Sequence, residues 1–132
     1  MNDNPSTMID MEEKRIRNAY EALNNEDYLA QIRQELDKCP EREEVLLRTR
    51  WYRTGLVLKD GVISLWDDSD VLEVDIYDVD ALRLMAALEV HTVDELYSAV
   101  KERSLASSER FSQFLDSHGI RYSSYSSRPD SF

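Results

Sequence analysis

The dipeptide Asp60-Gly61 separates two short runs of alternating aliphatic residues, and this feature constrains the fold more than any other. A two-residue type I′ turn needs positive φ at both central positions, which Asp-Gly accepts readily. With these residues as the turn, Lys59 pairs with Val62 and the pairing continues outward residue by residue. Four aliphatic side chains then share one face of the hairpin: Leu56, Leu58, Ile63 and Leu65. The sequence therefore predicts a hairpin with one buried face.

A third strand over residues 71–77 follows the hairpin. Its residues alternate strictly, so that the aliphatic ones face the core while Glu73 and Asp75 face outward. A turn rich in aspartate and serine, residues 67–70, connects it to the hairpin. These features predict a three-stranded antiparallel meander.

Helical spacing of apolar residues predicts helices on both sides of the meander. Residues 8–23 and 27–38 form two helices with a short link, which is typical of a helical hairpin. After the meander, residues 79–89 are apolar on every side, so we expect this helix, capped by Asp78, in the centre of the core. Thr92 begins a capping box, and Ser107 or Ser108 caps a last helix.

The predicted fold class is therefore α+β. It consists of an N-terminal helical hairpin, a three-stranded antiparallel meander and three further helices, and residues 120–122 can add a short strand. We expect residues 1–122 to form a single domain and residues 123–132 to form a Ser-rich, flexible tail.

Composition narrows the class of protein. The chain has 132 residues, 42% of them hydrophobic, which is enough for a core without disulfides. Cys39 is the only cysteine, so a disulfide scaffold is excluded. Without an apolar run of about 18 residues or a signal-like N-terminus, we expect a cytoplasmic protein that does not enter a membrane.

The acidic residues are concentrated in one segment. Net charge is −11, and residues 62–80 contain seven carboxylates and no Lys or Arg. This segment coincides with the predicted third strand, the turn before it and the cap after it. We therefore predict a partner-binding surface formed by the acids and a neighbouring tryptophan: Trp66, Asp67, Asp68, Asp70, Glu73, Asp75, Asp78 and Asp80.

Three other interpretations remain open at this stage. The arginines of a nearby basic segment, Arg48, Arg50 and Arg53, can neutralise these acids within the molecule. The acidity can instead reflect adaptation to salt, although that predicts even coverage of the surface. Trp66 can be an ordinary packed residue rather than an interface anchor.

No catalytic or metal-binding pattern stands out. Two histidines and one cysteine are too few for a zinc site. Residues 68–70 begin like a calcium loop but lack its glycine and terminal glutamate. With only three glycines there is no phosphate-binding loop. We therefore predict no catalytic residues, no metal and no cofactor, and interpret the chain as not being an enzyme.

The leading hypothesis is a small acidic binding protein. A rigid row of carboxylates can imitate the phosphates of nucleic acid, so the expected partner is a basic surface on a nucleic-acid-binding protein or nuclease. A phage counter-defence inhibitor that mimics DNA fits this description, and so does an immunity protein against a basic toxin. We expect no direct binding of nucleic acid or membrane. A regulatory subunit that forms a homodimer through apolar helices is the second hypothesis. An enzyme that uses clustered carboxylates and a divalent ion is the third.

Overall fold

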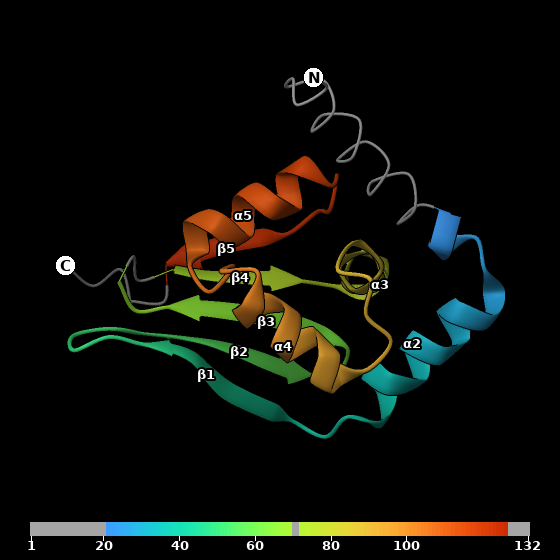
Figure 1. Ribbon diagram of the computed structural model, residues 1–132, viewed down its shortest axis with the longest axis horizontal. Coiled ribbons are helices and arrows are strands. Elements are labelled where there is room, and N and C mark those ends of the chain that lie inside the picture. The colour runs from blue at the N-terminus through green and yellow to red at the C-terminus, as the bar shows by residue number, and fades with distance from the viewer. Residues whose placement is uncertain (1–20, 70–71, 127–132) are drawn as a thin grey trace, which may run out of the picture.

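The computed structural model describes residues 21–69 and 72–126, and it has the predicted α+β class (Figure 1). Five strands form one antiparallel sheet in the order β1-β2-β3-β4-β5. They are β1 (Arg42–Arg48), β2 (Arg53–Lys59), β3 (Val62–Asp67), β4 (Leu72–Ile76) and β5 (Ser123–Ser126). The helices are α2 (Glu26–Lys38), α3 (Asp78–Ala87), α4 (Val93–Glu102) and α5 (Ser108–Ser117).

The predicted hairpin is confirmed in its register. Lys59 pairs with Val62, Leu58 with Ile63 and Leu56 with Leu65. Asp60 and Gly61 both have positive φ, 52° and 77°, as a type I′ turn requires. The aliphatic residues on this face are at most 1% exposed, and they form the core together with Val74 and Ile76.

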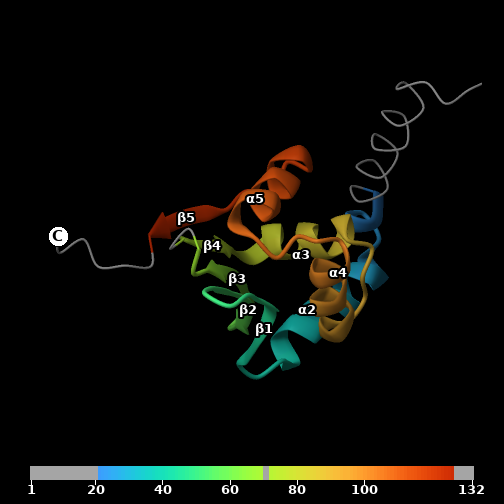
Figure 2. The same cartoon turned by 60° about the vertical axis from the view of Figure 1, so that its left-hand side comes forward.

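The described helices lie to one side of the sheet, which leaves its other face without a helical cover in this part of the chain (Figure 2). α3 is the most buried of them: six of its ten residues are buried, including Leu84 and Met85 at 0% exposure. The prediction of a central, all-round apolar helix is confirmed. We refer to the uncovered side of the sheet as the open face.

Two strands were not predicted correctly. β1 adds an edge strand beside β2, although its sequence is mostly charged. β5 begins at Ser123, whereas a short strand was expected over 120–122 and a flexible tail after it. This part of the expected tail pairs with β4, because the backbone of a serine-rich segment can complete a sheet edge without apolar side chains.

The helix boundaries show the remaining differences. The expected first helix, residues 8–23, lies outside the described residues except for its last turn. α2 matches its prediction, and the side chain of Asn25 caps it by accepting a hydrogen bond from the backbone N–H of Tyr28. Asp78 was predicted to cap α3, but it is the first helical residue and Tyr77 occupies the cap position. Thr92 and Ser107 cap α4 and α5 as expected, each accepting a backbone hydrogen bond.

Candidate partner-binding surface

The predicted site residues do not form one exposed surface. Trp66, Glu73 and Asp75 lie together on the open face, where Trp66 and Glu73 are directly paired across β3 and β4. Asp67 points toward the helices instead, and Asp78 and Asp80 lie in the first turn of α3. Asp70 lies outside the described residues.

Asp67 is an internal capping residue. It is 2% exposed and accepts a hydrogen bond from the backbone N–H of Ser108 at 2.7 Å. It also accepts hydrogen bonds from the hydroxyl of Ser69 at 2.6 Å and from the backbone N–H of Ser69 at 3.0 Å. Burial alone raises the pKa of Asp67, but these hydrogen bonds outweigh it and hold the pKa below the ordinary value of 3.8. Asp67 therefore fixes the start of α5 against the sheet and is not available to a partner. This corrects its assignment to the predicted surface.

Two further acids are balanced by arginines of the same chain. Asp68 lies 3.6 Å from the guanidinium of Arg53, and Asp80 lies 3.1 Å from that of Arg83. Asp80 also accepts a hydrogen bond from the backbone N–H of Arg121. The interpretation that nearby arginines neutralise the acids thus holds for Arg53. Within the described residues, Arg48 and Arg50 have no carboxylate within 4.0 Å.

The open face holds a pair of carboxylates among aromatic rings. Asp75 is 5% exposed and accepts a hydrogen bond from the Tyr77 hydroxyl at 3.2 Å, while Glu73 accepts one from the Tyr125 hydroxyl. Burial, and then the neighbouring Asp75 carboxylate, raise the pKa of Glu73. The outward direction predicted for both acids is confirmed by the register, but little of Asp75 reaches solvent.

Trp66 packs flat against β2. A Cβ atom added to Gly55 would lie 2.2 Å from Cζ2 of the indole, so the absence of a side chain at Gly55 makes room for the ring. The guanidinium of Arg53 lies 5.7 Å from the ring centroid. The packed interpretation of Trp66 is therefore supported, because both its strand partner and a neighbouring cation hold it in place.

The fold assembles a different group of carboxylates where α2, α4 and β1 meet. Arg42 of β1 contacts Glu44 at 2.9 Å and Asp94 of α4 at 2.6 Å. Glu35 of α2 accepts a hydrogen bond from the first residue of α4. We call five residues the acidic surface: Glu35, Glu44, Glu89, Asp94 and Glu95.

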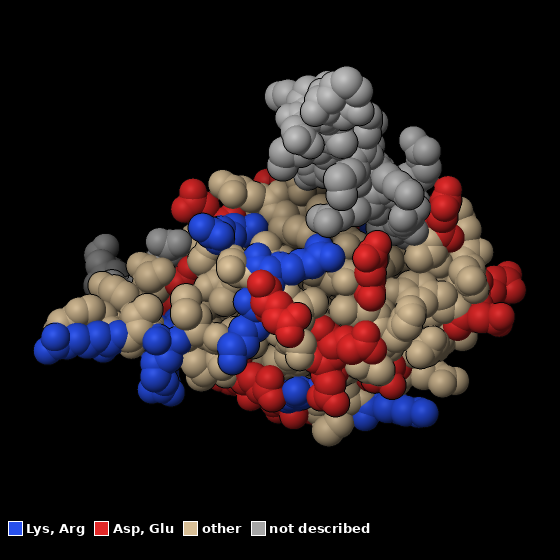
Figure 3. Space-filling model, viewed as in Figure 1, with Lys and Arg blue, Asp and Glu red and all other residues tan. Residues whose placement is uncertain are grey.

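Charge and packing connect the members of this surface. Burial and then the charges of Glu95 and Glu89, which disfavour the phenolate, together raise the pKa of Tyr28 to about 12. The side chain of Asp94 is 86% exposed even though it contacts Arg42. Figure 3 shows carboxylates gathered over α4 in the centre of the view, while Lys and Arg extend from the left-hand end, where the β1–β2 hairpin projects.

Sequence reasoning missed this surface because its residues are up to 60 positions apart. The capping box was visible in the sequence, but nothing indicated that its helix packs against the mostly charged strand β1. Tyr97 makes this connection: its hydroxyl donates to the backbone carbonyls of Arg42 at 2.8 Å and Leu56 at 3.3 Å. The contact is specific to the folded chain and leaves no pattern in the linear sequence.

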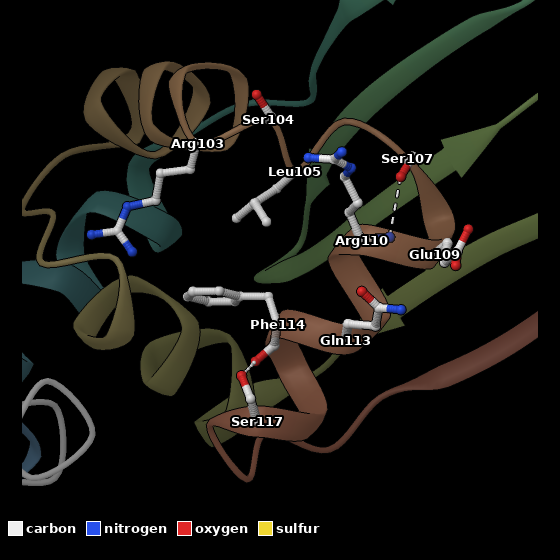
Figure 4. Close-up of a pocket in the computed structure, with 9 residues that line it drawn as sticks. All are labelled: Arg103, Ser104, Leu105, Ser107, Glu109, Arg110, Gln113, Phe114 and Ser117. Atoms are coloured by element: carbon white, nitrogen blue, oxygen red, sulfur yellow. Dashed lines mark hydrogen bonds between the residues drawn. The ribbon is translucent and has the colours of Figure 1, made fainter. Parts of the chain in front are cut away.

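A hollow lies between the end of α4 and α5 (Figure 4). Arg103 and Arg110 line it, together with Leu105 and Phe114. In Figure 4 the two guanidinium groups lie on opposite sides of Leu105 and do not converge on one point. The hollow therefore lacks the paired donors that recognise a phosphate or carboxylate.

Comparisons with protein-family models, with curated proteins and with solved structures found no match to this chain. Among the described residues, no helix is long and apolar enough to cross a membrane. In the same residues, no three His, Cys, Asp or Glu side chains gather as a metal site would require.

Proposed function

We propose that this chain is a small binding protein, not an enzyme, that docks its acidic surface on a basic surface of another protein. The observation that carries the proposal is the grouping of five carboxylates from α2, β1, α4 and the α3–α4 connection, two of which, Glu44 and Asp94, share the guanidinium of Arg42. Arg42 can balance only part of this charge. The remaining negative charge would speed the association of a basic partner and would define its orientation.

The class of partner that we favour is a nucleic-acid-binding protein or a nuclease. Such proteins expose cationic surfaces that neutralise phosphates, and carboxylates held on a sheet and two helices can occupy those surfaces. The chain would then act as an inhibitor by blocking the nucleic-acid site. An immunity protein against a basic toxin would use the same contact, so it belongs to the same proposal.

The test is inhibition of purified nucleases and DNA-binding proteins by the full chain. A triple variant, Glu89→Gln, Asp94→Asn and Glu95→Gln, removes three charges from the acidic surface and keeps the capping box, which accepts Gln. A matched control, Glu21→Gln, Asp60→Asn and Asp116→Asn, removes three exposed charges elsewhere. We expect the first variant to lose inhibition and the control to retain it.

A second pair of substitutions separates the acidic surface from the surface predicted from the sequence. Asp68→Asn with Glu73→Gln removes charge from the turn after β3 and from the open face, and we expect it to leave inhibition unchanged. If this variant loses inhibition while the acidic-surface variant retains it, the partner binds the open face and the proposal is wrong.

A further inference from the structure

We propose that Glu73 and Asp75 hold one proton between them on the open face, and that the loss of this proton as pH rises loosens β5 from the sheet. The two side chains are two residues apart on β4 and therefore face the same side. The register pairs Glu73 with Tyr125 and Asp75 with Ser123. The two carboxyl groups thus lie at the junction between β4 and β5.

One oxygen atom of Asp75 lacks a hydrogen-bond donor. Asp75 is 5% exposed, and its Oδ2 atom accepts a hydrogen bond from the Tyr77 hydroxyl at 3.2 Å. The buried Oδ1 atom has no partner among the described residues. This arrangement costs free energy, because no group replaces the water that the oxygen has lost. Glu73 is within hydrogen-bonding reach of Asp75, and in its protonated form it supplies the missing donor.

No cation in the described part of the chain balances the two carboxylates, since no Lys or Arg nitrogen lies within 4.0 Å of either one. On β2, Arg53 and Lys59 share the open face with Gly55, but they contact Asp68 and Glu41 instead. Two adjacent carboxylates without a cation repel each other when both are ionised. A single shared proton removes this repulsion.

The other groups beside the pair do not ionise near neutral pH. They come from β3, β5 and the end of β4, and they are Ser64, Trp66, Tyr77 and Tyr125. A phenol ordinarily keeps its proton until about pH 10, and the described helices lie on the other side of the sheet (Figure 2). The raised pKa of Glu73, caused by burial and then by the Asp75 carboxylate, agrees with a proton held on Glu73.

β5 is the element most sensitive to this proton. In the described sheet it pairs with β4 alone, and the side chains of Ser123, Ser124 and Tyr125 are exposed, so β5 gains little from apolar burial. Its side-chain connection to β4 is the hydrogen bond from the Tyr125 hydroxyl to Glu73. When Glu73 ionises, the Asp75 carboxylate repels it toward solvent, and Tyr125 loses its acceptor.

The direction of the pH effect follows from the raised pKa. The stabilisation from a protonated Glu73 is complete below the ordinary pKa of 4.5 and is lost as pH rises through the native value. This is opposite to the effect of Asp67, whose lowered pKa makes its contribution disappear as pH falls. The two groups can therefore be distinguished by pH alone.

The experiment is amide hydrogen exchange of the full chain followed by NMR from about pH 4.5 to pH 8, corrected for the intrinsic pH dependence of exchange. We expect the protection of the β5 amides to fall roughly tenfold over this range, while the amides of β2 and β3 keep theirs. Titration of the Glu73 carboxyl carbon in the same sample should have its midpoint where protection falls. The inference does not depend on the proposed partner, because its test needs only this chain.

Glu73→Gln keeps a neutral group that can donate to Asp75 and accept from Tyr125 at every pH, so β5 should stay protected throughout. Glu102→Gln, the same chemical change at an exposed position of α4, is the control and should behave as the unmodified chain. Circular dichroism confirms that each variant is folded. The proposal is overturned if Glu73 titrates near 4.5, or if Glu73→Gln loses β5 protection at the same pH as the unmodified chain.

Discussion

Replacing Asp67 by Asn tests whether the most buried of the predicted site residues supports the fold. The carboxylate accepts hydrogen bonds from Ser69 and from the Ser108 N–H at 2.7 Å. Its amide replacement presents N–H₂ to one of these donors. A hydrogen bond to a charged group contributes about 1.5–3 kcal/mol, and a lost helix cap costs about 1 kcal/mol. We therefore expect the free energy of unfolding to fall by about 2–3 kcal/mol.

The assay is thermal unfolding followed by circular dichroism, with Asp68→Asn as the matched control. For a chain of this size the loss corresponds to a decrease in Tm of roughly 10 °C. Asp68 is exposed and lies 3.6 Å from Arg53, so its replacement should change stability by about 0.5 kcal/mol or less. Equal and small effects of the two substitutions would refute the capping role of Asp67.

The pH dependence provides an independent check. Because the native pKa of Asp67 is lowered, its hydrogen bonds contribute fully above the unfolded-state pKa near 3.8 and are lost as pH falls through the native value. The unmodified chain should therefore lose stability below about pH 4. Asn has no charge to lose, so the difference between the two proteins should shrink over that range.

Three further predictions concern the open face and the contact between α4 and the sheet. Gly55→Ala should lower the free energy of unfolding by about 2 kcal/mol, because the added methyl overlaps the Trp66 indole. The same substitution should cost much less in a Trp66→Ala background, and equal costs in the two backgrounds would contradict the packing described. Tyr97→Phe removes hydrogen bonds to two backbone carbonyls and should cost about 1–2 kcal/mol in urea unfolding, whereas no change would mean that α4 is held by apolar contacts alone. Asp75→Asn removes a buried charge beside Glu73 and should raise the free energy of unfolding at neutral pH by about 1 kcal/mol. NMR titration of this variant should show a lower pKa for Glu73, and an unchanged pKa would exclude an interaction between the Glu73 and Asp75 carboxylates.

The parts of the fold that were predictable are those set by local chemistry. Asp60-Gly61 fixes a turn type, and that turn with alternating aliphatics fixes a register. The capping residues Thr92 and Ser107 mark helix starts for the same reason, because their hydroxyls accept bonds from the backbone three residues later. In each case the residues that determine the structure are neighbours in the sequence.

The parts that were missed depend on distant residues. β1 is mostly charged, and only its pairing with β2 and its contact with Tyr97 make it a strand. The role of Asp67 depends on Ser108, 41 positions away, so an acidic run gave no sign that one of its members turns inward. A count of charges along the segment therefore overestimated the charge available to a partner.

The same reasoning explains why the acidic surface appeared only with the structure. Alternation in β4 correctly indicated which side Glu73 faces, but it could not indicate how much of the neighbouring Asp75 the tyrosines cover. Conversely, Glu44 and Asp94 are far apart in the sequence and become neighbours through Arg42. Surface charge is a property of the folded chain rather than of a sequence window.

Titration of an arginine-rich peptide into ¹⁵N-labelled protein locates the surface that attracts cationic groups, and it does not require the partner to be known. We predict that the largest amide shift changes occur around Glu35, Glu44, Glu89, Asp94 and Glu95 and that they diminish as salt is added. Changes concentrated at Asp68, Glu73 and Asp78 instead would contradict the account and return the binding surface to the segment that the sequence first indicated.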